Sequence, residues 1–297
     1  MTETEESTQE AAEEQPAQEK PKRKKRTETP AVAAVESPAK RRALVTGASS
    51  GIGEAFARQL AKKRYDLVLV ARRRERLEKL AAELGEAHGI GAEVLETDLG
   101  GSEGVAMVER RLACGDVDLL VNNAGFATRG DFAAKSVWRE LEQIDVNVKA
   151  LVALTHAVLQ PMLAKKQGTI INVGSTGSFQ PVPYMSTYAA TKAFVLHFSE
   201  GLHEEVKKHG VTVTCLCPGY VMTEFQQVAG LDRNKIPSQG RVTPKQVAEA
   251  ALKGAADGRA IVIPGALNRT LATGFVRMTP RFAVRRIAGT LFKNAGA

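Results

Sequence analysis

The sequence predicts an α/β protein with a single doubly wound parallel sheet of about seven strands and helices on both faces. Seven short runs of branched apolar residues recur between positions 43 and 265, and each is short enough for a strand that is buried on both faces. Segments with helical periodicity lie between these runs. Regular alternation of strand and helix gives parallel strands joined by right-handed crossovers, which is the reason for this fold class.

Each expected element has a place in this order. The expected strands are ALVTG (43–47), DLVLVAR (66–72), AEVLETDL (92–99), DLLVNNAG (118–125), GTIINVGS (168–175), VTVTCLCPG (211–219) and AIVIPG (260–265). The expected helices are Ala55–Lys63, Glu75–Glu86, Ser102–Leu112, Trp138–Lys165, Tyr188–Lys208 and Pro244–Ala256. The carboxyl ends of the strands are where such a sheet binds its ligands.

The two ends of the chain differ in composition from this central region. Residues 1–40 are rich in Pro, Ala and Glu and contain 9 acidic and 7 basic residues, which predicts a disordered charged tail. Residues 41–265 contain the α/β domain. Residues 266–297 contain six basic residues and no acidic one, with apolar residues at helical spacing on both sides of Pro280. We expect a basic amphipathic helical extension there.

The composition also bounds the partners and the location of the protein. Of the formal net charge of +8, none comes from the slightly acidic tail, so the ordered part is basic. The run KPKRKKR (20–26) is typical of import signals or nucleic-acid patches, but in such a tail it indicates solvated charge, and we do not expect nucleic-acid binding. Three cysteines, an apolar-poor start and no uninterrupted apolar run of about 18 residues predict a soluble cytoplasmic protein.

The first two strand ends indicate a dinucleotide site. TGASSGIG (46–53) follows the first strand, and its glycines permit a tight turn in which backbone N–H groups approach a pyrophosphate, although an ordinary strand-to-helix turn uses the same residues. The second strand ends in VARRR, with no acidic residue for a ribose 2′-hydroxyl. Arg72 is the best placed arginine for a fork-like contact with a 2′-phosphate, which favours NADP(H) over NAD(H).

A proton-transfer group is predicted on the helix that follows the fifth strand. Tyr188 and Lys192 are one helical turn apart, so their side chains lie on one face, and a nearby ammonium lowers the pKa of a phenol. Ser175 ends the fifth strand, where its hydroxyl holds a substrate oxygen or merely caps the strand. Asn147 lies inside the long helix, where asparagine is a mediocre helix former, and its side chain holds a relay water or is a tolerated polar residue.

Together these motifs resemble the classical short-chain dehydrogenase/reductase family over nearly all of Arg42 to Gly265. The resemblance rests on TGASSGIG, NNAG (122–125), Asn147, Ser175, YAATK (188–192) and PGYVMT (218–223). It implies a Rossmann-type fold and a catalytic tetrad of Asn147, Ser175, Tyr188 and Lys192. In this family the tyrosine is the acid/base, the serine orients the substrate oxygen, the lysine grips the nicotinamide ribose, and the asparagine organises a proton-relay water.

The resemblance also completes the expected cofactor site. No metal site is expected, because Cys215 and Cys217 have too few other ligands nearby and the five histidines lack ligand spacing. The resemblance implies Asp98 near the adenine, Asn123 near the adenosine ribose, and Val221 and Thr223 at the nicotinamide amide. The full expected set is Gly47, Ser49, Ser50, Gly51, Ile52, Gly53, Arg72, Asp98, Asn123, Tyr188, Lys192, Val221 and Thr223. Members commonly assemble as dimers or tetramers through the helices that contain Asn147 and Tyr188, so the resemblance implies a homo-oligomer.

Three functions are compatible with these residues. The first is an NADP(H)-dependent oxidoreductase that acts on a ketone or secondary alcohol, with Tyr188 as the proton donor. The second is a catalytically idle dinucleotide sensor or scaffold on the same fold, and the intact tetrad argues against it. The third is an epimerase or dehydratase of the extended branch of the superfamily, whose glycine turn usually has another spacing.

The substrate region is predicted in the segment Met222–Pro244, which should form a lid. Its apolar residues fit a pocket wall, which favours a lipophilic carbonyl compound, or they are core contacts of a small lid helix; they are Phe225, Val228, Leu231 and Ile236. For the C-terminal extension, two alternatives stay open. It contacts an anionic membrane surface as a peripheral element, or its stripes pack on the protein itself.

Overall fold

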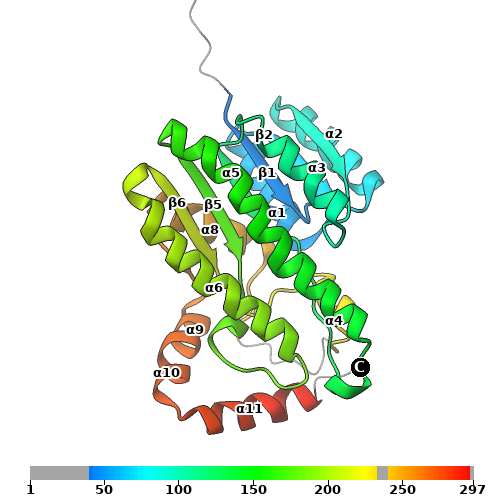
Figure 1. The fold of residues 1–297 in the computed structure, drawn as a ribbon, viewed down its shortest axis with the longest axis vertical. Coiled ribbons are helices and arrows are strands. Elements are labelled where there is room, and N and C mark those ends of the chain that lie inside the picture. The colour runs from blue at the N-terminus through cyan, green and yellow to red at the C-terminus, as the bar shows by residue number, and fades with distance from the viewer. Residues whose placement is uncertain (1–39, 233–239, 295–297) are drawn as a thin grey trace, which may run out of the picture. The chain divides into compact units, whose positions relative to one another are not determined.

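The computed structural model describes residues 40–232 and 240–294, and within them the predicted seven-stranded parallel sheet is present (Figure 1). The bounds are Arg42–Thr46 (β1), Asp66–Ala71 (β2), Ala92–Glu96 (β3), Leu119–Asn122 (β4), Gly168–Val173 (β5), Val211–Leu216 (β6) and Ile261–Val262 (β7). The order β3-β2-β1-β4-β5-β6-β7 reverses between β1 and β4. In a doubly wound sheet, ligands bind beyond the strand carboxyl ends at such a reversal.

Helices cover both faces of the sheet (Figure 1). One face packs against α1 (Gly51–Lys62), α2 (Arg74–His88) and α8 (Pro244–Ala256), and the other against α3 (Ser102–Leu112), α5 (Leu151–Lys165) and α6 (Ser186–Val206). Side chains alternate along a strand, so in β1 Ala43 and Val45 join the first hydrophobic layer and Leu44 the second. Burial of both faces explains why the central strands are rich in apolar residues, whereas the edge strand β3 also contains Glu93 and Glu96.

The long helix predicted over Trp138–Lys165 is not a uniform α-helix. α4 (Val137–Ile144) is joined to α5 by η2 (Asp145–Ala150), a stretch of π-helix. Such π turns are rare and occur frequently at functional sites. Among the described residues, Val137–Lys165 is also the one helix long and apolar enough to cross a membrane by length and composition alone. Leu154 and Val158 of its α5 part are buried in the second hydrophobic layer, as in a core helix.

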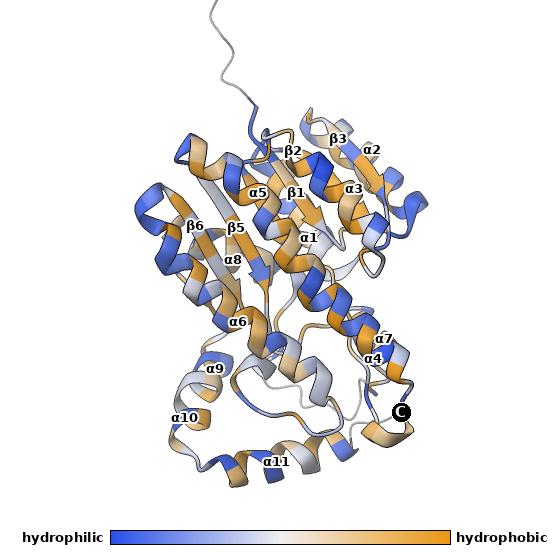
Figure 2. Ribbon diagram, viewed as in Figure 1, coloured by the Kyte–Doolittle hydropathy of each residue, from blue (hydrophilic) through white to orange (hydrophobic). Residues whose placement is uncertain are grey.

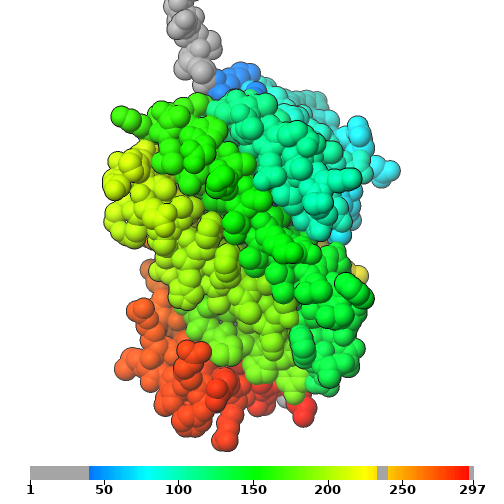
Figure 3. Space-filling model, viewed as in Figure 1, coloured from blue at the N-terminus to red at the C-terminus, as the bar shows by residue number. Residues whose placement is uncertain are grey.

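Short helical elements stand at the ends of the strands and after the sheet. Those between the strands are η1 (Phe132–Ala134), η3 (Thr176–Phe179), η4 (Lys207–His209) and α7 (Phe225–Val228). Those after β7 are α9 (Ala266–Arg269), η5 (Thr270–Phe275), α10 (Val276–Met278) and α11 (Arg281–Asn294), so helices occur on both sides of Pro280. In Figure 2, α11 alternates between apolar and polar residues, and Figure 3 shows the segment after β7 against the domain beside α6.

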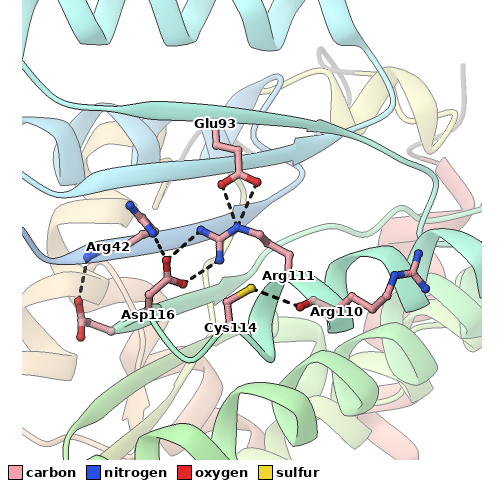
Figure 4. Close-up of polar contacts among 7 residues, drawn as sticks. Arg42, Glu93, Arg110, Arg111, Cys114 and Asp116 are labelled. Carbon is pink, nitrogen blue, oxygen red and sulfur yellow. Dashed lines mark hydrogen bonds and ion pairs between the residues drawn. The ribbon is translucent and has the colours of Figure 1, made fainter.

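Ion pairs tie the amino ends of β1 and β3 to α3, at the opposite end of the strands from the predicted site (Figure 4). Arg111 on α3 donates from Nε to Oε2 of Glu93 at 2.8 Å and from Nη1 to Oδ1 of Asp116 at 2.7 Å. Asp116 also pairs with Arg42, whose backbone N–H donates to Oδ2 of Asp118 at 2.8 Å. Half-exposed pairs of this kind contribute little free energy each, about 0–1 kcal/mol. Because Asp116 and Asp118 directly precede β4, these contacts hold the start of that strand beside β1 and α3.

Candidate active site

The glycine-rich turn after β1 has the backbone geometry that an anion site needs. Gly47 and Gly51 have φ angles of +66° and +60°, which residues with a Cβ rarely adopt. A Cβ at Gly53 would lie 2.2 Å from the carbonyl oxygen of Gly47. The turn leads into α1, whose first N–H groups have no helical partner and can bind a phosphate. The other predicted residues of this turn are Ser49, Ser50 and Ile52.

Asn123, predicted near the adenosine ribose, follows β4 and fastens this turn. Its Nδ2 donates to the carbonyl oxygen of Thr46 at 2.9 Å. The backbone N–H groups of Asn123 and Ala124 both donate to Oγ1 of Thr46, at 2.9 and 3.0 Å. Because Thr46 is the last residue of β1, these bonds lock the β1 and β4 carboxyl ends together at the reversal of strand order.

The arginines after β2 reach different partners. Arg72 is exposed, and its Nη1 lies 3.6 Å from Oδ2 of Asp98, so two of the predicted cofactor residues lie side by side. Arg73 reaches back over the glycine-rich turn. Its Nη2 donates to Oγ of Ser49 at 3.0 Å and to Oγ of Ser50 at 2.8 Å. Sequence reasoning singled out Arg72 and missed Arg73, because only the fold reveals which guanidinium reaches the turn.

A carboxylate from the segment after β6 faces the same arginines. Glu224 accepts hydrogen bonds from Nη1 of Arg73 and Nη1 of Arg76, both at 2.7 Å. The bonds from Arg76 and Arg73 lower the pKa of Glu224 to about 2, so it is ionised at neutral pH. A Cβ at Gly51 would lie 3.1 Å from Cγ2 of Thr223. The segment after β6 therefore covers one side of the glycine-rich turn.

Val221 and Thr223 are held in place by Gln226, which sequence reasoning also missed. Nε2 of Gln226 donates to the carbonyl oxygen of Val221 at 2.6 Å, and the backbone N–H of Thr223 donates to its Oε1 at 2.9 Å. Gln226 is buried although its neighbours in α7 are partly exposed. One buried amide thus fixes the backbone of both residues that were predicted to face the nicotinamide.

Tyr188, Lys192 and Ser175 come together at the carboxyl end of β5. Nζ of Lys192 lies 5.9 Å from the centre of the Tyr188 ring and donates to the carbonyl oxygen of Val173 at 2.7 Å. The Ser175 hydroxyl accepts from the backbone N–H of Gly177 at 3.0 Å, so it caps η3, and it also hydrogen-bonds Tyr188. Ser175 is therefore both the predicted cap and a neighbour of the phenol.

The pKa of Tyr188 corrects the expectation from the sequence. Proximity to Lys192 predicted a lowered pKa, but burial raises the pKa of Tyr188 to about 12, and the hydrogen bond with Ser175 offsets this only in part. The lysine ammonium points its hydrogen bond at Val173 instead of at the phenol, and burial lowers the pKa of Lys192 to about 8. The effect of desolvation on the pKa of Tyr188 outweighs that of the nearby lysine charge, so the phenol is protonated at neutral pH.

Asn147 lies in the π turn η2 and is fully engaged. Its Oδ1 accepts from the backbone N–H of Phe126 at 3.1 Å, and its Nδ2 donates to the carbonyl oxygen of Phe126 at 3.0 Å and to Oγ1 of Thr191 at 3.1 Å. A Cβ at Gly125 would lie 2.8 Å from this Oδ1 and 3.6 Å from Nζ of Lys192. The glycine of NNAG thus allows the asparagine to approach the lysine.

An apolar cluster adjoins Tyr188. The rings of Tyr188 and Phe225 are 5.6 Å apart. The cluster consists of Ala127, Val182, Met185, Ala189, Ala229 and Leu231, with Tyr188, Phe225 and Phe292 packed against it. Two of the predicted lid residues, Phe225 and Leu231, therefore belong to it, whereas Val228 is 56 % exposed. Ile236 lies outside the described residues.

The C-terminal helix α11 packs against this cluster through Phe292, which agrees with the alternative that the stripes pack on the protein itself, but these partners were not predicted. Arg129 donates from Nε to the carbonyl oxygen of Phe292 at 3.0 Å and from Nη2 to that of Lys293 at 2.9 Å, so it caps the end of α11. A Cβ at Gly289 would lie 3.5 Å from Cγ of Pro183. These partners are more than 100 positions apart in the chain, and no periodicity in the sequence could have paired them.

The described part of the chain contains no group of three or more His, Cys, Asp and Glu side chains that could hold a metal ion. Cys215 and Cys217 lie on one face at the end of β6, buried and reduced, with their Sγ atoms 3.6 Å apart. They pack with Val195 and Leu196 of α6 in a hydrophobic cluster.

Comparison with known proteins identifies the family. The family described as short chain dehydrogenase matches residues 41–234. The chain is 32% identical over 219 residues to a very-long-chain 3-oxoacyl-CoA reductase from Anas platyrhynchos, covering 71% of this chain and 67% of the relative. It is 39% identical over 195 residues to a serine 3-dehydrogenase from Agrobacterium fabrum, covering 62% and 74%.

A solved structure agrees with the sequence relatives. A short-chain dehydrogenase from Sphingobium yanoikuyae in complex with NADPH is 37% identical, with a TM-score of 0.74, over 80% of this chain and 93% of that one. The match to the family includes the glycine-rich turn and the cluster of Asn147, Ser175, Tyr188 and Lys192. The chain therefore belongs to the short chain dehydrogenase family of oxidoreductases.

Proposed function

We propose that the protein is an NADP(H)-dependent oxidoreductase that interconverts a ketone and a secondary alcohol. The proposal rests on one observation: the side chains of Tyr188, Ser175, Lys192 and Asn147 lie close together at the carboxyl ends of the strands, where the glycine-rich turn also lies. The nicotinamide, when bound, supplies or accepts the hydride. The chain itself must orient the substrate oxygen and move one proton.

Tyr188 is the proposed proton donor for reduction of the ketone. Because burial raises its pKa to about 12, the phenol keeps its proton at neutral pH and can deliver it to the developing alkoxide. Ser175, which hydrogen-bonds the same phenol, is the proposed second donor to the substrate oxygen. Lys192 and Asn147, whose side chains both lie next to Gly125, are the residues proposed to support reprotonation of the phenol.

The preference for NADP(H) rests on the charge at the end of β2. The residues after this strand are three arginines, of which Arg72 is exposed next to Asp98 and Arg73 lies on the glycine-rich turn. A 2′-phosphate gains charge-assisted hydrogen bonds from such guanidinium groups, whereas NAD(H) offers them only a hydroxyl. The similar structure from Sphingobium yanoikuyae contains NADPH, which supports this preference.

A lipophilic substrate is favoured by the apolar cluster around Tyr188. The Phe225 ring lies 5.6 Å from that of Tyr188. Phe292 of α11 packs against the same cluster, to which Val182 and Met185 also belong. The very-long-chain 3-oxoacyl-CoA reductase among the relatives acts on an acyl chain, which agrees with an apolar wall. The alternative of an idle dinucleotide-binding scaffold has no specific observation in its favour.

The proposal predicts NADPH-dependent turnover of lipophilic ketones. In assays of NADPH absorbance over a panel of ketones of increasing chain length, with serine and small polar alcohols assayed in the oxidative direction, we expect the largest kcat/KM for long-chain or bulky apolar ketones. NADH should support lower kcat/KM with every substrate. Binding of NADPH without turnover across the whole panel would instead establish the idle scaffold.

Association into a homo-oligomer is proposed from the surface of α4. Four large apolar side chains at this end of the domain are exposed, namely Phe132, Val137, Trp138 and Leu141. Contiguous exposed apolar side chains mark interfaces more often than free surface. The continuous helix α4–η2, which contains Asn147, and α6, which contains Tyr188, are thus the proposed subunit contact.

Peripheral membrane contact is proposed from the C-terminal extension. Ala272, Val284 and Ala288 pack inward, as expected if the stripes covered the protein itself, but Leu271, Phe275 and Met278 remain 47 %, 46 % and 87 % exposed. The six basic residues of this segment are exposed too, and within the described residues none forms a salt bridge; they are Arg269, Arg277, Arg281, Arg285, Arg286 and Lys293. Apolar and cationic exposure together fit an anionic lipid surface in an otherwise cytoplasmic protein.

Vesicle sedimentation checks this contact. The full chain should pellet with anionic vesicles at low salt and be released at high salt, since exposed charges are then screened. Phe275→Glu together with Met278→Glu should abolish pelleting, because both apolar contacts would be replaced by repelled charges. Met107→Glu, at an exposed apolar position on α3, is the matched control and should pellet normally. Equal pelleting of both variants would exclude the extension as the lipid contact.

A further inference from the structure

A buried carboxylate lies at the junction of three elements beside the candidate active site. Glu140 of α4 is 4 % exposed. One of its oxygens accepts a hydrogen bond from the hydroxyl of Thr128, in the segment after β4, and the other accepts from the hydroxyl of Thr187, in the first turn of α6. Nζ of Lys135 lies 2.9 Å from the second oxygen and is itself nearly buried. The two oxygens of this carboxylate therefore connect α4 to the segment after β4 and to the first turn of α6.

The charge of Glu140 is maintained despite its burial. Desolvation raises the pKa of this carboxyl, but the hydrogen bonds from Thr128, Thr187 and Lys135 outweigh it, so the pKa is lowered. A buried ionised group with this many partners holds its neighbours in one arrangement, because releasing any of them leaves a charge unsatisfied. The location also suits the charge, since Thr187 belongs to the positive amino end of α6.

The two hydroxyls that Glu140 holds lead directly to the two sides of the tetrad. Thr187 immediately precedes Tyr188, so a shift of this hydroxyl turns the first turn of α6 and the phenol with it. Thr128 lies two residues after Phe126, whose backbone N–H and carbonyl both bond the Asn147 side chain. The Glu140 carboxylate therefore connects the two halves of the tetrad: Thr187 links it to Tyr188, and Thr128 links it to the segment that holds Asn147.

A neighbouring glutamine strengthens the same junction. The backbone N–H of Thr128 donates to Oε1 of Gln143 at 2.9 Å, and Gln143 is fully buried one turn after Glu140 on the same helix. Glu140, Gln143 and Asn147 are spaced three and four positions apart, so all three project from one face of the α4–η2 helix. The α4–η2 helix therefore contributes these three polar side chains to the surroundings of the site.

We propose that Glu140 is a positioning residue for proton transfer: it fixes the Tyr188 hydroxyl relative to Asn147 and Ser175 by holding Thr187 and Thr128. The proposal rests on the proposed function. Glu140 is buried and both of its oxygens are bonded to Thr128, Thr187 and Lys135. We therefore expect its loss to affect the geometry of the reacting groups and not the binding of NADPH. A displacement of about 1 Å at a reacting group can cost about 100-fold in rate.

The test is Glu140→Gln, which keeps the shape of the side chain but removes the charge that holds both hydroxyls. For the ketone that the full chain reduces best, kcat should fall about 10- to 100-fold, while the Kd for NADPH in a fluorescence titration changes less than about 2-fold. Glu142→Gln is the matched control, because Glu142 lies on the same helix and pairs with Arg139 at the surface. It should keep the full kcat.

Further variants keep the test decisive. Thr187→Val and Thr128→Val each remove one hydroxyl, and each should lower kcat less than Glu140→Gln does. If both act through Glu140, adding either to Glu140→Gln should cause little further loss, since residues of one network are not additive. Full kcat in Glu140→Gln, or equal losses of kcat and NADPH affinity in all three variants, would overturn the proposal.

The proposed function and this inference can fail separately. If the unmodified protein reduces no ketone, the proposed function fails. If the unmodified protein is active and Glu140→Gln is equally active, only the positioning role fails. Should Glu140→Gln unfold, which its circular dichroism would show, the Thr187→Val variant alone decides, because it leaves the carboxylate paired with Lys135 and Thr128.

Discussion

Replacement of Tyr188 with phenylalanine should lower kcat for ketone reduction by at least about 100-fold, the usual scale of general acid catalysis. The change removes only the hydroxyl that hydrogen-bonds Ser175 and leaves the ring packed 5.6 Å from that of Phe225. The KM for the substrate should change little, because the apolar contacts are kept. Steady-state kinetics with a saturating concentration of NADPH measures this loss.

Tyr184→Phe is the matched control for this variant. Tyr184 lies four positions earlier, at the same end of the domain, and its backbone carbonyl, which the substitution leaves unchanged, accepts a hydrogen bond from Gly130 at 3.0 Å. We expect full activity in this variant. Turnover by the Tyr188→Phe enzyme at the rate of the unmodified protein would refute the assignment of Tyr188 as the acid.

The second large effect concerns the cofactor. Arg72→Ala should weaken NADPH binding by about 10- to 150-fold, which corresponds to about 1.5–3 kcal/mol for a charge-assisted hydrogen bond to the 2′-phosphate. NADH binding should be unchanged, because NADH has no phosphate at this position. Fluorescence titration with both nucleotides gives the two affinities.

Two neighbouring arginines separate the causes. Arg73→Ala should weaken both nucleotides, because Arg73 holds the hydroxyls of Ser49 and Ser50 in the turn that would bind the pyrophosphate. Arg74→Ala removes an exposed arginine that pairs with Glu78 in its own helix, and it should weaken neither. If the unmodified protein binds NADH more tightly than NADPH, the assignment of NADP(H) is wrong.

Much of this architecture is readable from the sequence because the signals are local. Runs rich in branched apolar residues predicted all seven strands, since helices on both faces of a parallel sheet bury most side chains of its central strands. The glycine-rich turn could be predicted because its glycines are local requirements: Gly47 and Gly51 have positive φ angles, and Gly53 leaves no room for a Cβ. The pairing of Tyr188 with Lys192 could be predicted because residues four positions apart lie on one face of a helix.

The parts that escaped prediction are set by contacts between distant segments. Arg73 and Glu224 are 151 positions apart, and Arg129 lies 163 positions from Phe292, so only the fold brings them together. The lowered pKa predicted for Tyr188 failed for a related reason. Sequence spacing places a lysine near a phenol, but it does not reveal that burial outweighs that charge or that the Val173 carbonyl takes the lysine's hydrogen bond.

The place of Phe292 in the wall beside Tyr188 also orders the events of biosynthesis. The glycine-rich turn and all seven strands end by Val262, whereas the apolar cluster beside Tyr188 is completed by Phe292 of α11, the last described helix. Chains grow from the amino end at about 5–20 residues per second, and domains begin to fold as they emerge. We therefore expect a nascent chain to build its nucleotide half first. Until Arg129 captures the end of α11, that chain exposes the apolar surface around Phe225 to chaperones and to other nascent chains.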